Sequence, residues 1–281
     1  MMKSPLFLSN ILLLPLFLLL SSMLHCQRAP PVLDYDLTKP HVIPLSKPLK
    51  EISGIVVSEN RVFAISDDKG QLYQLNLDDG KIVNQWTFGE ADDYEDVTVV
   101  ADRFFILNSN GNIVSFTLPQ AGSPVIKIFK FPFGKGNEFE ILYYDKQNRQ
   151  LVMVCKECKD DGTGRLSAYT IDPSTGNYQP APFKINTAAA GLQGTNKPNR
   201  LKPSAAAIHP ASGEVYMISS INKAMIRMNR NGKVISVHPL KRKVFEQPEG
   251  ITFTADGNML ISNEAGQKDQ ATLLQFKHKP N

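Results

Sequence analysis

The chain has 281 residues, 42% of them hydrophobic, and a formal net charge of +4. This length and hydrophobic share are enough for one sizeable domain with its own core. The charged residues are interspersed without long runs of one sign, which excludes the clustered basic stripe of a nucleic-acid-binding protein. No nucleic-acid partner is therefore expected, and the domain is expected to be a monomer.

Residues 1–25 have the pattern of an export signal and are not expected to belong to the fold. One lysine precedes a leucine-rich stretch, which is followed by small residues and Cys26, the order typical of secretory signals. Cys26 is the expected lipidation site of the mature chain, although Leu24 and His25 depart from the small residues usual before such a cysteine. The alternatives are an uncleaved anchor over residues 6–24, which is long enough to span a bilayer, and cleavage with release. All three place the folded part outside the cytoplasm.

Residues 26–44 are expected to form a tether that ends in a strand, and residues 45–281 the folded domain. Within that domain a strand pattern recurs five times, with a first strand, a polar turn, an apolar second strand, a third strand and usually a fourth. Turn signals such as SEN, DDG, NGN and RNG fall where hairpins need them. The five repeats begin at Glu51, Asp93, Glu138, Lys202 and Gln247.

Four antiparallel strands in every repeat of about 40 residues are typical of propeller blades. The sequence therefore predicts an all-β fold, a β-propeller of five four-stranded blades. The last repeat has only three clear strands, so a strand within residues 32–45 is expected to complete it and close the ring, which removes a free sheet edge. Residues 179–200 are weak in strand pattern, and we interpret them as an excursion over one face. A sixth blade is the alternative.

Two cysteines, Cys155 and Cys158, lie in the motif CKEC within the third repeat. In an oxidising compartment they are expected to pair as a disulfide. Two free thiols are the first alternative. A redox or zinc role is less favoured, because the motif lies in a predicted hairpin and no second cysteine pair accompanies it.

Acidic residues recur at the start of the first strand of the repeats. Because the first strand of each propeller blade is the innermost, equivalent positions should form a ring around one end of the central channel. The second strand runs back antiparallel, so its end should return to the same mouth. The third position of the five repeats holds Ser53, Glu95, Glu140, Ser204 and Glu249, and the second-strand ends include Asp67, Lys156, Glu157 and Glu264.

Clustered carboxylates need a cation, a proton or a basic partner. An all-oxygen ligand set suits calcium before magnesium, so the expected metal ligands are Glu95, Glu140, Glu249 and Glu264. Further ligand contacts are expected from Glu51, Asp67, Lys156 and Glu157. Two alternatives stay open, which are structural capping of the strands and a catalytic acid–base cluster without metal.

The strand starts SGI, YEDV, FEIL and PEGI, together with the N-terminal signal, resemble those of the SdiA-regulated domain family of bacterial envelope proteins. The resemblance covers about residues 45–278 and implies a β-propeller, with looser similarity to NHL-type, gluconolactonase-like and phytase-like propellers. The Lys–Glu pair of the CKEC motif is similar to one that the family has after the second strand of the third blade, which implies a site role for Lys156 and Glu157.

Two functions are compatible with these patterns. The first is a membrane-anchored binding module of the cell envelope that recognises a small ligand, a glycan or a protein at the carboxylate-lined mouth. The alternative is a calcium-dependent hydrolase of phosphoesters or lactones, with Lys156, Lys202 and Arg200 as the available basic groups. The sequence has no G-x-S-x-G elbow, phosphate-binding glycine loop or H-E-x-x-H motif. The fold alone supports neither function, and we favour the binding module.

Overall fold

A computed structural model of the chain describes residues 1, 34–159, 161, 164–187 and 201–279. The export signal, the lipidation site Cys26 and the basic residue Arg200 lie outside these ranges, so the predictions made for them stay predictions. Residues 32–281 form a compact unit of their own. No helix within the described ranges is long and apolar enough to cross a membrane.

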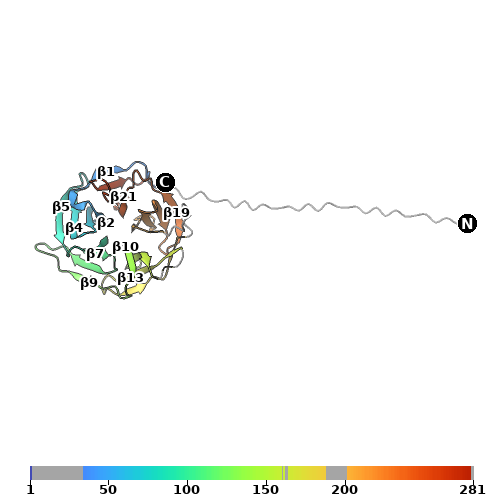
Figure 1. Ribbon diagram of the computed structural model, residues 1–281, viewed down its shortest axis with the longest axis horizontal. Coiled ribbons are helices and arrows are strands. Elements are labelled where there is room, and N and C mark those ends of the chain that lie inside the picture. The colour runs from blue at the N-terminus through green and yellow to red at the C-terminus, as the bar shows by residue number, and fades with distance from the viewer. Residues whose placement is uncertain (2–33, 160, 162–163, 188–200, 280–281) are drawn as a thin grey trace. The chain divides into compact units, whose positions relative to one another are not determined.

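The strands form the predicted β-propeller, in which five four-stranded antiparallel sheets surround a central axis (Figure 1). Blade 1 consists of β2 (Ile52–Ser58), β3 (Arg61–Ser66), β4 (Lys69–Leu75) and β5 (Ile82–Thr87). Blade 2 consists of β6 (Tyr94–Val100), β7 (Arg103–Asn108), β8 (Ile113–Thr117) and β9 (Lys127–Phe129). Blade 3 consists of β10 (Asn137–Asp145), β11 (Gln150–Cys158), β13 (Ala168–Ile171) and β14 (Tyr178–Pro180).

The remaining two blades complete the ring. Blade 4 consists of β16 (Ala205–Ile208), β17 (Val215–Ser219), β18 (Ala224–Met228) and β19 (Val234–Pro239). Blade 5 consists of β20 (Pro248–Phe253), β21 (Met259–Asn263), β22 (Thr272–Phe276) and β1 (His41–Pro44). A 3-10 turn, η1 (Lys47–Leu49), leads from β1 into blade 1.

The second strand of each blade is an apolar run, because the blades on both sides cover it. In β7, RFFILN, every residue after Arg103 is buried, and β17 and β21 are buried throughout. Aromatic side chains fill the space between neighbouring blades. Phe63 of blade 1 and Phe104 of blade 2 meet edge to face with their ring centroids 4.9 Å apart. The innermost strands β2, β6, β10, β16 and β20 each contact the next around the ring.

The N-terminal strand closes the last blade, as the sequence predicts. β1 pairs antiparallel with β22, from His41 opposite Gln275 to Pro44 opposite Thr272, and Figure 1 shows β1 on the rim beside the strands of blade 5. Pairing of the first strand with the last removes the free edge that each would otherwise present.

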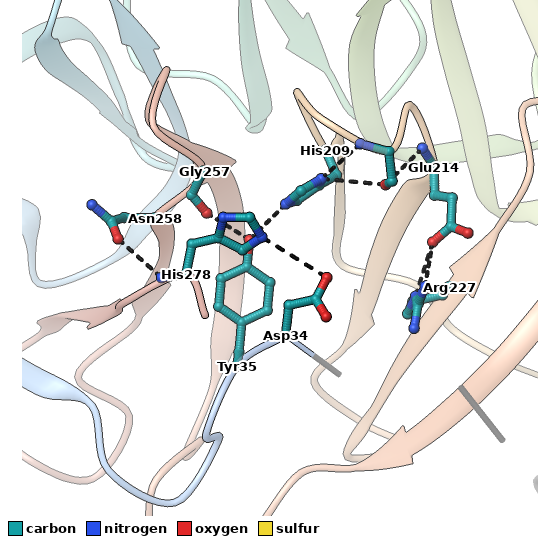
Figure 2. A network of polar contacts seen from close by, with 9 residues as sticks. Asp34, Tyr35, His209, Glu214, Arg227, Gly257, Asn258 and His278 are labelled. Carbon is teal, nitrogen blue, oxygen red and sulfur yellow. Dashed lines mark hydrogen bonds and ion pairs between the residues drawn. The ribbon is translucent and has the colours of Figure 1, made fainter. Parts of the chain in front are cut away.

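A second contact fixes the segment before β1 to blades 4 and 5 (Figure 2). The Tyr35 hydroxyl donates a hydrogen bond to the carbonyl oxygen of Gly257 (2.6 Å) and lies 2.8 Å from Nε2 of His209. Nδ1 of His209 accepts a hydrogen bond from the backbone N–H of Ser212 (3.1 Å). The neutral imidazole therefore carries its proton on Nε2, and this N–H donates a hydrogen bond to the hydroxyl oxygen of Tyr35. Burial lowers the pKa of His209, which favours this neutral form.

The loop region after blade 3 departs slightly from the predicted excursion. Residues 179 and 180 belong to β14, the fourth strand of blade 3, so the excursion starts later than the sequence indicates. In the described part of the excursion, β15 (Ile185–Asn186) pairs with β12 (Arg165–Leu166) in a separate two-stranded sheet. The fold is therefore five-bladed, and the sixth-blade alternative is not needed. Cys155 and Cys158 of blade 3 are joined by a disulfide.

Candidate functional site

The first strands of the blades begin around a cavity of ≈ 660 Å³ at one end of the central channel. The third position of every repeat lies on its wall, as the alignment of the strand starts predicts. These five residues are Ser53, Glu95, Glu140, Ser204 and Glu249. A pattern that recurs in sequence thus becomes a ring in space, because each repeat contributes the same strand position to the same end of the channel.

β-Bulges explain why the acids among these residues face the cavity. In β6 the pairing with β7 passes from Tyr94 to Asp96 and leaves Glu95 without a partner. The same irregularity leaves Glu140 unpaired in β10 and Glu249 unpaired in β20. On β11 the register also skips Lys156, opposite the step from Glu138 to Phe139 and next to the bulge at Glu140. Because a bulged residue does not follow the regular alternation of a strand, its side chain can turn toward the channel axis.

The ends of the second strands return to this mouth, although not with every predicted residue. Asp67, Lys156 and Glu264 line the cavity. Glu157 does not lie on the cavity wall, and its carboxylate instead pairs with Lys202 at 3.0 Å near the rim. Glu51 is also outside the wall, but its side chain hydrogen-bonds Glu264. The structure therefore brings most of the predicted site residues together and leaves two at its margin.

Lys156 lies between two carboxylates of blade 3. Its Nζ is 2.9 Å from an oxygen of Glu138 and also pairs with Oε1 of Glu140. Burial opposes the charge on Lys156, but the two carboxylates outweigh it and raise the pKa of the lysine. An ammonium group thus supplies the local positive charge at Glu140, the residue that the sequence assigns to calcium.

Glu95 and Glu140 come from neighbouring blades and hydrogen-bond each other through their carboxyl groups. Burial raises the pKa of both, and for Glu95 the adjacent Glu140 charge adds to the effect. One of the two carboxyl groups must therefore carry the proton that makes this hydrogen bond. The pair holds a proton at a pH where an exposed glutamate would be ionised.

Glu249 lies on the opposite side of the mouth. Burial raises its pKa, even though the hydroxyl groups of Ser220 and Ser204 hydrogen-bond its carboxyl group. Ser204 is itself held in place, because its Oγ accepts the backbone N–H of Ser220 at 3.0 Å. These neutral donors orient the Glu249 carboxyl group, and the nearby charges of Lys156 and Lys223 also favour its ionised form, but burial outweighs them.

A third acidic group contains Glu264, Glu51 and Asp67. Burial, together with the hydrogen bond to Glu51, raises the pKa of Glu264 to about 8, and Nε2 of Gln247 donates to its carboxylate at 2.9 Å. Burial and the neighbouring charges of Asp68 and Glu51 raise the pKa of Asp67 to about 6. Oδ1 of Asp67 is buried and has no hydrogen-bond partner.

These shifts predict that Glu264 destabilises the fold at alkaline pH. Above its ordinary pKa of 4.5 the unfolded chain releases this proton, whereas the folded chain keeps it until about pH 8. Folding then binds a proton, so the free energy of unfolding falls as the pH rises through this interval. A Glu264→Gln variant cannot titrate, and its melting temperature should exceed that of the wild type by a few degrees at pH 9 while the two agree at pH 5. If the melting temperatures of Glu264→Gln and the wild type differed by the same amount at pH 5 and at pH 9, the raised pKa assigned to Glu264 would be contradicted.

The mouth also contains residues that the repeat pattern does not reveal. Lys223, Arg242 and Glu246 line the cavity from the loops of blades 4 and 5. They lie outside the aligned strand starts, and no periodic signal singles them out. In the part of the chain that the structure describes, no three His, Cys, Asp or Glu side chains are grouped closely enough to hold a metal ion. The calcium role of Glu95, Glu140, Glu249 and Glu264 therefore stays a prediction.

The comparisons with known proteins agree with this architecture. The family model named SdiA-regulated matches residues 36–267, which is most of the chain. The protein belongs to the SdiA-regulated family. The match spans all five first strands and therefore every acid at the third position of a repeat. No curated protein shows a significant match to this member of the family.

Solved structures share the propeller fold with this SdiA-regulated protein. A glutaminyl cyclase from Myxococcus xanthus superimposes with a TM-score of 0.59 at 17% identity, over 84% of this chain and 94% of that one. A luciferin-regenerating enzyme gives a TM-score of 0.50 at 10% identity, over 85% of this chain and 95% of that one. At these identities the similarity concerns the fold alone.

Proposed function

We propose that this SdiA-regulated protein is a binding module of the cell envelope whose acidic cavity takes a small cationic ligand, an organic amine. The proposal rests on the net charge of the cavity wall. The wall contains eight acidic side chains, Asp67, Asp93, Glu95, Glu138, Glu140, Glu246, Glu249 and Glu264. It contains four basic ones, Lys156, Lys202, Lys223 and Arg242.

With all groups ionised, eight carboxylates and four cations give the wall a net charge of −4, whereas the whole chain carries +4. Burial raises the pKa of Glu249 despite the nearby charges of Lys156 and Lys223, and burial together with neighbouring carboxylates raises the pKa of Glu264. A cationic ligand would add positive charge to the cavity and displace the protons that these carboxyl groups hold. A concave site with several polar groups directed toward one space is also the usual form of a small-molecule site.

The proposal predicts that amine binding is linked to proton release. We would titrate putrescine, calcium chloride and the neutral 1,4-butanediol into residues 32–281 by calorimetry at pH 6, 7.5 and 9. Putrescine is expected to bind more tightly as the pH rises, because the cation binds to the ionised carboxylates. Butanediol should not bind. Glu249→Gln is expected to weaken putrescine about tenfold, the effect of one charge-assisted contact.

Glu59→Gln is the matched control, since Glu59 is exposed and pairs with Arg61. Failure of putrescine to bind, or equal binding by the wild type and Glu249→Gln, would overturn the proposal. Tight calcium binding that is lost in a Glu140→Gln, Glu249→Gln double variant would instead support the metal site predicted from the sequence.

The location outside the cytoplasm is part of the same proposal. It rests on the N-terminal signal and on the membrane anchor expected at Cys26 or within residues 6–24. The disulfide between Cys155 and Cys158 supports it, since disulfides persist in oxidising compartments and are rare in the cytosol.

A hydrolase remains the second candidate, and one observation favours it. The hydrogen-bonded Glu95–Glu140 pair holds a proton inside the cavity next to Lys156, and a buried carboxylic acid of this kind can act as a general acid. If the protein is a hydrolase, phosphoester or lactone cleavage should depend on Glu95 and should be lost in Glu95→Gln.

A further inference from the structure

The outer edge of blade 2 differs in composition from the rest of the surface. Residues 119–137 contain three lysines and no aspartate or glutamate. The segment runs from the β8–β9 loop through β9, on the rim of the ring in Figure 1, to the start of β10. We call residues 121–136, most of which are exposed, the β9 edge.

Large apolar side chains are concentrated on the β9 edge. Nine large hydrophobic side chains are exposed in the described part of the chain, and four of them lie here. Their exposed fractions are 90% for Val125, 56% for Ile128, 44% for Phe133 and 36% for Ile126. Scattered single apolar residues on a surface are ordinary, but a contiguous group indicates an interaction site.

The blade core accounts for Phe133, whose ring packs against Phe131 and Tyr169 with centroids 5.5 Å and 5.2 Å away, but not for the rest of this composition. Within β9 only Phe129 is buried, and its ring packs against Phe105 of the same blade, with the ring centroids 6.3 Å apart. β9 pairs with β8 on one side only. Lysine on an edge strand protects against unwanted strand pairing, which explains Lys127. It does not explain exposed valine and isoleucine in the preceding loop.

The lysines of the β9 edge are available for a partner. Lys127, Lys130 and Lys135 form no ion pair with any described acidic side chain, and all three are exposed. Nζ of Lys127 lies 4.5 Å from the centre of the Phe129 ring. The β9 edge thus carries three positive charges and no negative charge among its apolar side chains. It complements a partner whose surface layer is anionic and whose interior is apolar.

This combination fits a lipid surface better than a protein. The cores of protein–protein interfaces are depleted in lysine. Anionic membranes attract clusters of lysine, and apolar side chains beside them insert at the boundary between headgroups and acyl chains. We propose that the β9 edge binds the surface of a membrane that contains anionic phospholipid. This contact would be separate from the N-terminal anchor expected from the sequence and from the acidic cavity.

The test is co-sedimentation of residues 32–281, which omit the N-terminal signal and contain the complete ring, with vesicles. One set contains phosphatidylglycerol and phosphatidylcholine, and the other phosphatidylcholine alone. Binding is expected only with the anionic vesicles and should weaken in high salt. Replacing Lys127, Lys130 and Lys135 by glutamate should reduce vesicle affinity by at least about 100-fold.

The control variant replaces three exposed lysines on other blades by glutamate, Lys146, Lys233 and Lys277. It should bind the anionic vesicles markedly more tightly than the β9-edge variant.

Insertion of the apolar residues gives an independent readout. In a Val125→Trp variant that also carries Trp86→Phe, the tryptophan emission should shift to the blue on anionic vesicles and be quenched by brominated acyl chains. In a Val83→Trp variant of the same background, changed at an exposed position on the outer strand of blade 1, the emission should not respond. The proposal would be overturned if the protein did not bind anionic vesicles, or if both lysine triple variants lost binding equally. Quenching of the tryptophan at position 83 alone would also overturn it. Absence of vesicle binding would leave a protein partner as the occupant of this edge.

Discussion

Replacing Asp96 by alanine is expected to lower the free energy of unfolding by about 3 kcal/mol, because it leaves two buried backbone N–H groups without a hydrogen-bond acceptor. Asp96 is 4% exposed. Its Oδ1 accepts the backbone N–H of Val97, and its Oδ2 accepts that of Leu142, each at 2.8 Å. Since Leu142 belongs to β10, this carboxyl group joins the innermost strands of blades 2 and 3. Urea denaturation of the wild type and the variant measures the loss.

Asp96→Asn separates the hydrogen bonds from the volume of the side chain. The amide keeps one acceptor oxygen of nearly the same shape, so roughly half the loss is expected. Asp102→Ala, in the exposed turn of the same blade, should leave stability unchanged. An Asp96→Ala protein as stable as the wild type would show that the contact between the two strands is not needed.

Replacing Gly250 by valine should cost about 3 kcal/mol of stability through overpacking against backbone. A Cβ atom at this position would lie 2.5 Å from Oγ of Ser262 and 2.6 Å from the carbonyl oxygen of Ser53. Those two atoms form a hydrogen bond of 3.1 Å between blades 5 and 1, which the new side chain would have to displace. Thermal denaturation should show a clear decrease in melting temperature.

Gly136→Ala is the comparison for Gly250→Val. Gly136 has a φ of +87° and open space around it, so its substitution tests backbone strain without crowding and should cost about 1 kcal/mol. If both variants lose the same stability, close packing of the blades is not the reason for glycine at position 250.

Gly250 also shows which features of the fold could be predicted from the sequence and which could not. The repeated strand starts predicted the blades, the closing strand and the ring of third-position residues, because periodicity in a propeller maps directly onto rotation about one axis. The short motifs SGI and EGI recur for a reason that only the structure supplies. At Gly54 and Gly250 the innermost strands of adjacent blades approach too closely for a Cβ atom.

Contacts that depend on irregular backbone could not be predicted. The bulges at Glu95, Glu140 and Glu249 leave no clear mark in residue type. The pairing of Lys156 with Glu138 and Glu140 depends on a register shift in β11. The sequence placed Glu157 with Lys156 at the mouth, but in a strand consecutive side chains point to opposite faces, and Glu157 lies at the rim.

The strand order of blade 5 has a consequence for how the protein reaches its folded state. His41 pairs with Gln275, so a chain that emerges from a ribosome or a translocation pore N-terminus first presents β1 long before its partner. Blades 1 to 4 can assemble from local hairpins, whereas closure must wait for β22 and involves a contact of very long sequence separation. Such contacts form slowly. Until closure, the unpaired edges of β1 and of the incomplete blade 5 are available to other chains, and this interval is the one in which misassembly or a chaperone's help would matter most.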